Sequence, residues 1–352
     1  MLIDSPPEQS ADPTAAAEPA RGRRRAVRAA GLLVSVGVLL LICVASIVVG
    51  AKPVPLGDVW HGLFHSSGTG NDVLIQDLRM PRTVLGVIVG VALGLSGAVM
   101  QALTRNPLAE PGLLGVNAGA SAAVVTAISF LGVTSLTGYV WFAFLGAAVV
   151  SVVVYALGGS RSATPVRLAL AGTAATAALY GYVNAVQLLD SAALDRLRFW
   201  TVGSLANADM ATVRSVAPFI GVGVVLALLI ARPLNAMEMG DDTARALGAH
   251  LNRTRALGMV SVTLLCGAAT AACGPIVFIG LMVPYLVRAL TGPDMRWILP
   301  YAAVLSPVLL LGSDVLGRVV ARPSELQVGI VTALVGGPVF IHLVRRKRMA
   351  QL

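Results

Sequence analysis

The sequence predicts an all-α polytopic membrane protein with about ten transmembrane helices. Its mean hydropathy is +0.81. Apolar residues make up 56% of the chain and charged residues only 12%, whereas charged residues make up about a quarter of a soluble domain. Apolar runs long enough to cross a hydrocarbon core of ~30 Å recur along the chain, separated by short charged or Gly- and Pro-rich breaks.

Ten candidate spans are found between these breaks. They are 31–50, 83–103, 113–131, 138–157, 166–189, 213–231, 256–272, 276–290, 298–316 and 328–344. An even number of spans places both termini on the same side of the membrane.

The basic residues predict the orientation. Lys and Arg total 26 against 17 acidic residues, a net charge of +9, and with ten spans 18 of these basic residues lie on the side of the termini and 8 on the other. Because cytoplasmic loops are enriched in Lys and Arg, both termini are predicted to be cytoplasmic. The surplus of basic charge therefore indicates orientation and not nucleic-acid binding.

These assignments give one membrane domain with two tails. Residues 1–30 are rich in Ala, Pro and Glu and then basic, and are predicted to be a disordered cytoplasmic tail. The transmembrane domain is 31–344, with a cytoplasmic loop at 232–255, and 345–352 is a cytoplasmic tail. The first apolar run lacks a clear cleavage site, so it is expected to be retained and not removed as a signal peptide.

The second span leads into a proline-punctuated hinge. Gly86, Gly90 and Gly94 recur every fourth residue, so a neighbouring helix can approach closely. Ordinary helix packing is the favoured interpretation of this stripe, and the smooth wall of a substrate path is the alternative. Two prolines and Asn106 in 104–112 end the helix, so the stretch 79–119 is predicted to be a helical hairpin.

The loop 232–255 is predicted to contain a short helix. Asp241 and Asp242 precede a helix-compatible run that Gly248 can close. A short amphipathic helix held between two spans offers a rigid surface to a soluble partner. A solvated loop is the alternative.

Several kinds of chemistry have no support in the sequence. The only lysines, Lys52 and Lys347, stand outside any P-loop pattern, so ATP would have to be bound by another chain. Within the spans, acidic and histidine residues are confined to Asp314 and His342 near span ends, which disfavours an ion-coupled secondary transporter. No nucleophile–histidine set or pair of carboxylates indicates an enzyme.

No metal site is expected. His61 and His65 have helical i, i+4 spacing and could hold a metal, but an exposed surface pair is the favoured interpretation because no acidic or thiol partner accompanies them. Cys43, Cys266 and Cys273 all fall in spans and are interpreted as small buried apolar residues.

Seven segments together resemble the FecCD-type permeases of bacterial ABC importers for ferric siderophores, haem and vitamin B12. The 104–119 and 197–205 segments are most similar to the ferric enterobactin branch. The segments are RMPR (79–82), TRNPLAEPGLLGVNAG (104–119), PVRLALAG (165–172), LRFWTVGSL (197–205), GDDTARALG (240–248), GPIVFIGLMVPY (274–285) and GPVFIHLVRRK (337–347).

The resemblance implies an ABC type II importer permease fold in the bacterial cytoplasmic membrane. The implied partners are a second permease chain, identical or related, two ATPases that bind ATP and Mg²⁺, and an extracytoplasmic substrate-binding protein. This chain would itself bind no cofactor. The implied cargo is a ferric siderophore, with haem or cobalamin as the alternative, moved by alternating access.

The resemblance also implies three sets of site residues. The ATPase-coupling helix would be Asp241, Asp242, Thr243, Ala244, Arg245, Ala246, Leu247 and Gly248. The basic residues that meet the binding protein, expected to be partly exposed, would be Arg79, Arg82 and Arg318. The translocation path, which need not bind chelated iron directly, would involve Gly94, Ser96, Gly97, Met100, Gln101 and Asn117.

Overall fold

The computed structural model describes residues 17–50, 54–64, 70–133, 135–158 and 165–349, and its regular elements there are all helices. A π-helical stretch, η1 (Leu74–Arg79), joins α3 to α4, and a 3₁₀ turn, η2 (Pro111–Leu114), precedes α5. The α-helices are α1 (Ala17–Val48), α2 (Leu56–Phe64), α3 (Asn71–Val73), α4 (Met80–Thr104), α5 (Val116–Leu131), α6 (Leu136–Leu157), α7 (Pro165–Leu189), α8 (Ser191–Trp200), α9 (Met210–Leu229), α10 (Ala231–Glu238), α11 (Asp241–Ala246), α12 (Leu251–Cys273), α13 (Ile279–Thr291), α14 (Met295–Val320) and α15 (Val328–Met349).

The prediction of a polytopic helical membrane protein is confirmed. Each of the ten predicted spans falls on a helix, namely α1, α4, α5, α6, α7, α9, α12, α13, α14 and α15. Within the described residues, six helical segments are long and apolar enough to cross a membrane, and Val116–Leu131, Ile279–Thr291 and Val328–His342 are shorter apolar helices.

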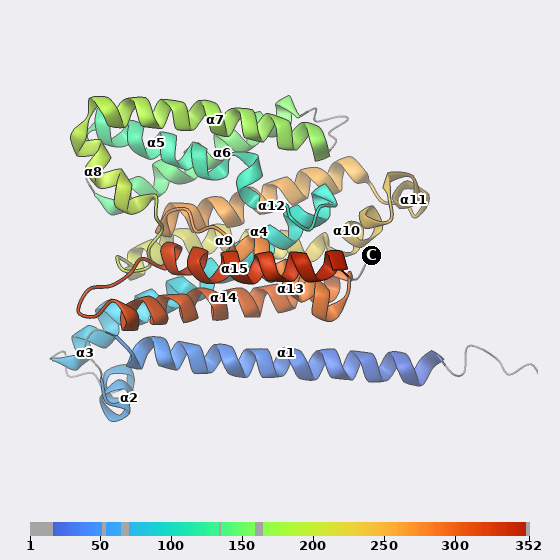
Figure 1. Cartoon of the computed structure of the whole chain (residues 1–352), viewed down its shortest axis with the longest axis horizontal. Coiled ribbons are helices and arrows are strands. Elements are labelled where there is room, and N and C mark those ends of the chain that lie inside the picture. The colour runs from blue at the N-terminus through green and yellow to red at the C-terminus, as the bar shows by residue number, and fades with distance from the viewer. Residues whose placement is uncertain (1–16, 51–53, 65–69, 134, 159–164, 350–352) are drawn as a thin grey trace, which may run out of the picture.

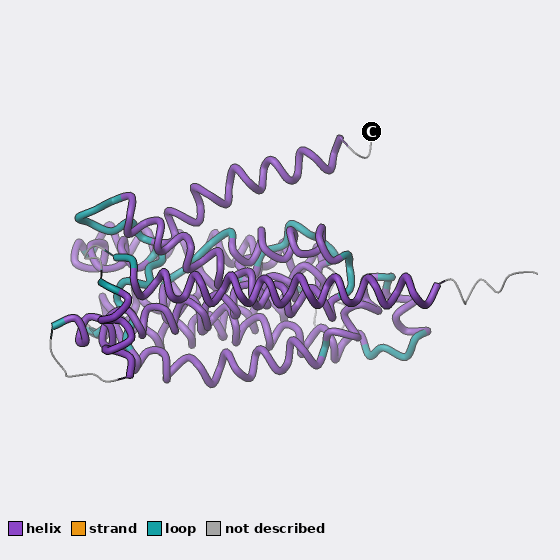
Figure 2. The backbone as a smooth tube through the Cα atoms, turned by 90° about the horizontal axis from the view of Figure 1, so that it is seen from below, coloured by secondary structure: helices purple, strands orange, loops and turns teal. Residues whose placement is uncertain are grey.

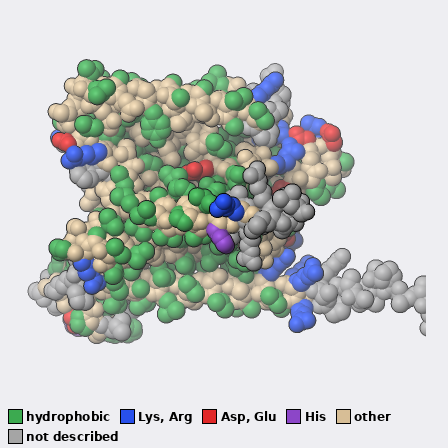
Figure 3. Space-filling view, in the orientation of Figure 1, with side chains coloured by type: hydrophobic (Ala, Val, Ile, Leu, Met, Phe, Trp, Pro, Cys, Tyr) green, Lys and Arg blue, Asp and Glu red, His purple; other side chains and the backbone are tan. Residues whose placement is uncertain are grey.

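The long helices run roughly along one direction, so the bundle has two ends (Figures 1 and 2). The start of α1, the end of α15 and the short helix α11 lie towards one end, here called the α11 end. Helices α2 and α3 lie at the other, here called the α2 end (Figure 1). Hydrophobic side chains are spread over the face between them and few charged side chains appear there (Figure 3), as expected of a surface that meets lipid or another apolar helix.

Helices extend into both predicted tails. Helix α1 begins at Ala17, so the assignment of disorder through residue 30 is wrong for 17–30. This stretch is rich in Ala and Arg, which are good helix formers, and it extends a helix that already exists. Helix α15 likewise continues to Met349. Residues 1–16 and 350–352 lie outside the described residues.

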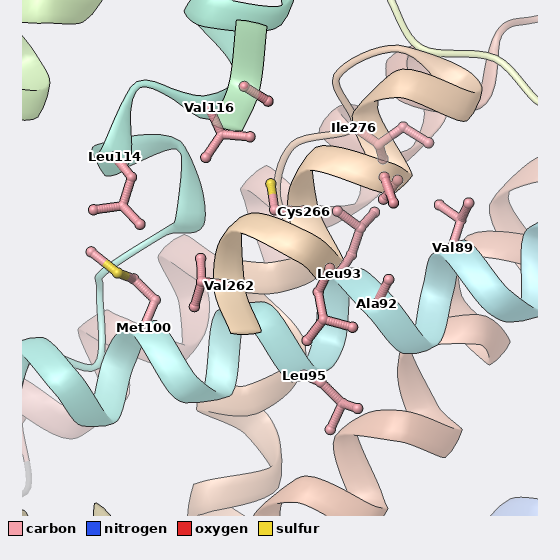
Figure 4. Packing of buried hydrophobic residues seen from close by; sticks show 14 of the residues in the cluster. Val89, Ala92, Leu93, Leu95, Met100, Leu114, Val116, Val262, Cys266 and Ile276 are labelled. Carbon is pink, nitrogen blue, oxygen red and sulfur yellow. The ribbon is translucent and has the colours of Figure 1, made fainter. Parts of the chain in front are cut away.

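Helix α4 lies at the centre of the bundle and packs on α14, α12, α13 and α9. Its buried Val89, Leu93 and Met100 share a core with α12 residues Val262 and Cys266 (Figure 4). The helix is buried over most of its length, whereas the apolar stretch of α1 is mostly exposed or half-buried and packs mainly on α14.

The glycine stripe of α4 is a helix-packing surface. A Cβ atom at Gly90 would lie 2.5 Å from Pro307 Cα of α14, and one at Gly97 would lie 1.8 Å from the Gly280 carbonyl oxygen of α13. No side chain fits at such distances, so these glycines set the spacing between α4 and its neighbours. The favoured interpretation of the stripe is confirmed.

Candidate functional site

An arginine cluster at the α2 end surrounds one buried carboxylate. Arg82 Nη2 lies 2.7 Å from Asp314 Oδ1, and Arg318 Nη2 lies 2.8 Å from Asp314 Oδ2. Arg82 also pairs with Glu325, the Nη1–Oε2 distance being 2.7 Å. Asp314 and Arg318 are 0% and 2% exposed. A buried charge requires such partners, because removal from water is costly unless it is paired and hydrogen-bonded.

The same cluster holds the end of α1. Arg318 Nη1 donates to the carbonyl oxygens of Ser46 (2.8 Å) and Val49 (2.9 Å). Arg79 Nη1 donates to those of Ile47 (2.5 Å) and Val48 (2.9 Å). The last carbonyls of a helix lack intrahelical donors and carry partial negative charge, so guanidinium groups satisfy both needs. The two arginines therefore fix α1 to α14 and α4.

This arrangement contradicts the expected partial exposure of Arg79, Arg82 and Arg318, because all three side chains are buried. Their hydrogen-bonding groups are directed at α1 and Asp314. Beside them lies a cavity of about 270 Å³, bordered by Gly50, Leu74, Leu78, Ala206, Glu325 and the three arginines. Their role in docking a binding protein stays a prediction.

The predicted short helix is present at the α11 end. It comprises Asp241–Ala246, follows Gly240 at φ +103°, and is closed by Gly248 at φ +78°, the left-handed region that glycine tolerates. Ala244 packs inward and is buried, while the Asp242 side chain is 99% exposed. The helix thus presents charged groups outward from a surface held by α10 and α12.

Asp241 connects α11 to two other parts of the chain. Its Oδ1 lies 2.5 Å from Arg105 Nη2, in the hinge after α4, and its Oδ2 lies 2.8 Å from Arg255 Nη2, in α12. Burial alone would raise the pKa of Asp241, but the hydrogen bond from Arg255 and the charges of Arg255, Arg105 and Arg245 hold it below its usual value.

The residues predicted for the path are packed inside the chain. Gln101 is 1% exposed and its Nε2 donates to the Leu281 carbonyl oxygen at 2.9 Å, and Ser96 is fully buried. Met100 is also buried, and Gly94 and Gly97 contact α14 and α13. Half-buried Asn117 accepts a hydrogen bond from Thr270 at 3.0 Å. Any role in lining a path stays a prediction, and for the α4 residues it requires α4 to separate from its neighbours.

Glu110 was not singled out from the sequence. Within the described residues its carboxylate has no hydrogen bond or ion pair. It precedes η2, which packs against α7, and it lies within electrostatic range of Tyr180 in α7 and Cys266 in α12. Glu110 lies outside the apolar runs, so the pattern of interior charges within those runs does not include it. Its mark in the sequence is an acidic residue flanked by Pro107 and Pro111 between two uncharged spans.

The sequence-derived metal candidates are dispersed in the structure. His61 Nδ1 lies 3.5 Å from Asp72 Oδ2, and His65 lies outside the described residues. Cys266 and Cys273 are buried, and Cys273 Sγ donates to the Ala269 carbonyl oxygen. Across the described ranges, no three His, Cys, Asp or Glu side chains are grouped in a way that could hold a metal ion.

Comparison with known proteins identifies the family. The model of the FecCD transport family matches residues 38–346. The chain belongs to the FecCD transport family. Its members are transport permeases and not enzymes, in agreement with the absence of a catalytic constellation in the sequence.

Individual relatives cover almost the whole chain. The ferric enterobactin transport system permease protein FepD of Escherichia coli K12 is 45% identical over 326 residues, covering 92% of this chain and 96% of its own length. The hemin transport system permease protein HmuU of Yersinia pestis is 36% identical over 318 residues, covering 88% of this chain and 93% of its own length. A solved structure described as an inward-facing metal-chelate type ABC transporter matches with a TM-score of 0.79 at 26% identity. The match covers 89% of this chain and 98% of the chain in that structure.

Proposed function

We propose that this FecCD family chain is the permease subunit of an ATP-driven importer that moves a ferric siderophore of the catecholate type across the bacterial cytoplasmic membrane. The observation that carries the proposal is the 45% identity to FepD over 92% of the chain. The fold likeness to a metal-chelate type ABC transporter supports the same class of machine.

The working complex would contain a second permease chain, two ATPases and an extracytoplasmic substrate-binding protein. The lack of a P-loop supports ATP and Mg²⁺ binding by another chain. Helix α11 would be the segment that rests on an ATPase, because it is short, exposed on one face and anchored on the other. The excess of Lys and Arg on the side of the termini supports a cytoplasmic location of the α11 end.

Transport would proceed by alternating access. In this conformation α4 is packed tightly against α13 and α14 at Gly94 and Gly97, so opening a path requires relative movement of these helices. Asn117 and Glu110 lie beside the hinge and are less deeply packed than Ser96 or Gln101. They would be the first polar groups to meet a cargo when the hairpin opens.

Haem is the second candidate cargo, favoured by the 36% identity to HmuU. Cobalamin would use the same machinery, although no observation on this chain favours it. The three cargoes differ in charge and shape, so a direct uptake measurement separates them.

The test is uptake by the complex copurified from its native membrane and reconstituted in vesicles with its binding protein. We expect ATP-dependent uptake of ferric enterobactin that exceeds uptake of haem or cobalamin. A matched complex whose ATPase lacks its P-loop lysine is the control. Uptake without ATP, or no ATP-dependent uptake of any of the three, would contradict the proposal.

A further inference from the structure

The coupling helix α11 is linked by a side-chain ion pair to the hinge between α4 and η2. We propose that Arg105 is a positioning residue that transmits movement of α11, through Asp241, to this hinge. The inference rests on the proposed function, because it assigns a route by which an ATPase under α11 would reach the helices of the path.

On α11, the link to the hinge is made by a single side chain. Among the described residues, Asp241 is the only α11 side chain that forms an ion pair or hydrogen bond with a different helix or loop. The other pair on this helix, Asp242 with Arg245, is internal and exposed. The Asp241–Arg105 pair is therefore the direct side-chain connection between α11 and the hinge.

Arg105 occupies the point where α4 ends. Its φ of +49° is one of two positive φ values at non-glycine residues in the described ranges, the other being at Phe278. Its backbone N–H donates to the Ala102 carbonyl oxygen at 3.3 Å. A residue held in this sparsely populated region depends on its surroundings to stay there. The ion pair to Asp241 is one of the contacts that can hold it.

The hinge has room to move on one side. Residues 105–108 are exposed, and a cavity of about 220 Å³ lies beside them. The Gln101 Oε1 atom is buried there without a hydrogen-bond partner among the described residues. The cavity is lined by Gln101, Arg105, Asn106, Pro107, Glu238 and Arg288.

The far side of the hinge is tightly packed. A Cβ atom at Gly172 of α7 would lie 1.6 Å from the Leu113 carbonyl oxygen, whereas one at Gly280 of α13 would lie at ordinary contact distance, 3.4 Å, from Pro111 Cδ. Movement of the hinge is therefore passed most directly to α7. These are the contacts that an opening path has to rearrange.

The decisive variant is Arg105→Gln, because Arg105 lies outside α11 and the variant leaves every residue of that helix unchanged. The reconstituted complex is assayed for copurifying ATPase, for ATP hydrolysis and for cargo taken up per ATP. We expect normal assembly, hydrolysis within two-fold of the unmodified complex, and uptake per ATP lowered about five-fold, the size expected for loss of one coupling contact.

Two further variants make the result specific. Arg105→Gln in the Asp241→Asn background should add little, because Asp241→Asn has already removed the contact that Arg105 makes. Glu238→Gln is the matched control, since its pair with Arg288 has a similar length, 2.7 Å, and lies beside the same cavity but joins α10 to α13. It should leave uptake per ATP within two-fold.

The outcomes separate the two proposals. Unchanged uptake per ATP in Arg105→Gln, loss of ATPase from the complex, or an equal effect of Glu238→Gln would overturn the role of Arg105 while the unmodified complex still transports. Failure of the unmodified complex to transport would instead remove the proposed function and, with it, this inference. Hydrogen exchange at residues 105–110 should rise on ATP addition, and do so less in Arg105→Gln.

Discussion

The two ends of the bundle use the same residue types for different purposes. At the α2 end, Arg318 and Asp314 are nearly inaccessible, and the guanidinium groups also satisfy the last carbonyls of α1. At the α11 end, Asp241 and Arg105 are about one-third exposed and join a short helix to an exposed hinge. A buried pair is costly to break, whereas a half-exposed pair contributes little to stability and can re-form at low cost.

The strongest test of this difference is Arg318→Met, which leaves α1 without its main donor and Asp314 with Arg82 alone. We expect the free energy of unfolding in detergent to fall by about 3–5 kcal/mol. The control is Arg198→Met, which breaks an exposed pair with Asp195 on α8 and should cost about 0–1 kcal/mol. Equal decreases in the free energy of unfolding for the two variants would show that burial of the arginine cluster contributes nothing to stability.

A second test addresses the packed middle of the bundle. Gly97→Ala places a methyl group against the Gly280 carbonyl and should lower the free energy of unfolding by about 1–3 kcal/mol. Gly312→Ala in α14 is the control, because no atom lies within 4 Å of its added Cβ. That change should be neutral or stabilising, since Ala favours helix over Gly by about 1 kcal/mol. An unchanged free energy of unfolding in Gly97→Ala would argue against close approach of α4 and α13.

A third test asks whether the α2 end also docks the binding protein. Glu325→Gln removes the half-exposed acidic group of the cavity while Asp314 still pairs with Arg82 and Arg318. If acidic residues of the binding protein meet this surface, Glu325→Gln should lower the dissociation constant of the complex between the binding protein and this chain. The decrease should be about two- to five-fold at low salt, with little change at high salt. Asp195→Asn, outside the cavity, supplies the same change in net charge. An identical response to both would remove the cavity from the docking site.

The smallest effect is expected from pH at the α11 end. The pKa of Asp241 is lowered in the folded chain, so its pairs contribute stability at a pH above the ordinary carboxyl value of about 4 and lose it as the pH falls through the folded-state pKa. The melting temperatures of the unmodified chain and Asp241→Asn should differ slightly at pH 7 and converge in acid. A difference that persisted at pH 3 would contradict ionisation as its cause.

The sequence could predict features that depend on local patterns. Uncharged runs located the ten spans, the prolines near Asn106 located the hinge, and Asp241 with Gly248 located the short helix, because helix ends and lipid burial leave direct marks in composition. The span ends were predicted only to within a few residues. The span expected to begin at 276, for example, begins at Ile279, since the apolar stretch before it runs without helix from Gly274, at φ +75°.

By itself, the sequence determined that this chain is a bundle of membrane helices in the FecCD transport family. Only the tertiary structure decided what its polar residues contact: Arg79 and Arg318 bind the end of α1, Gln101 is enclosed, and Glu110 stands without a partner among the described residues. Hydropathy measures whether a segment can leave water, and it says nothing of which neighbour the segment will contact. The contacts of a charged side chain depend on atoms hundreds of residues away, such as Ser46 and Arg318, which no local pattern specifies.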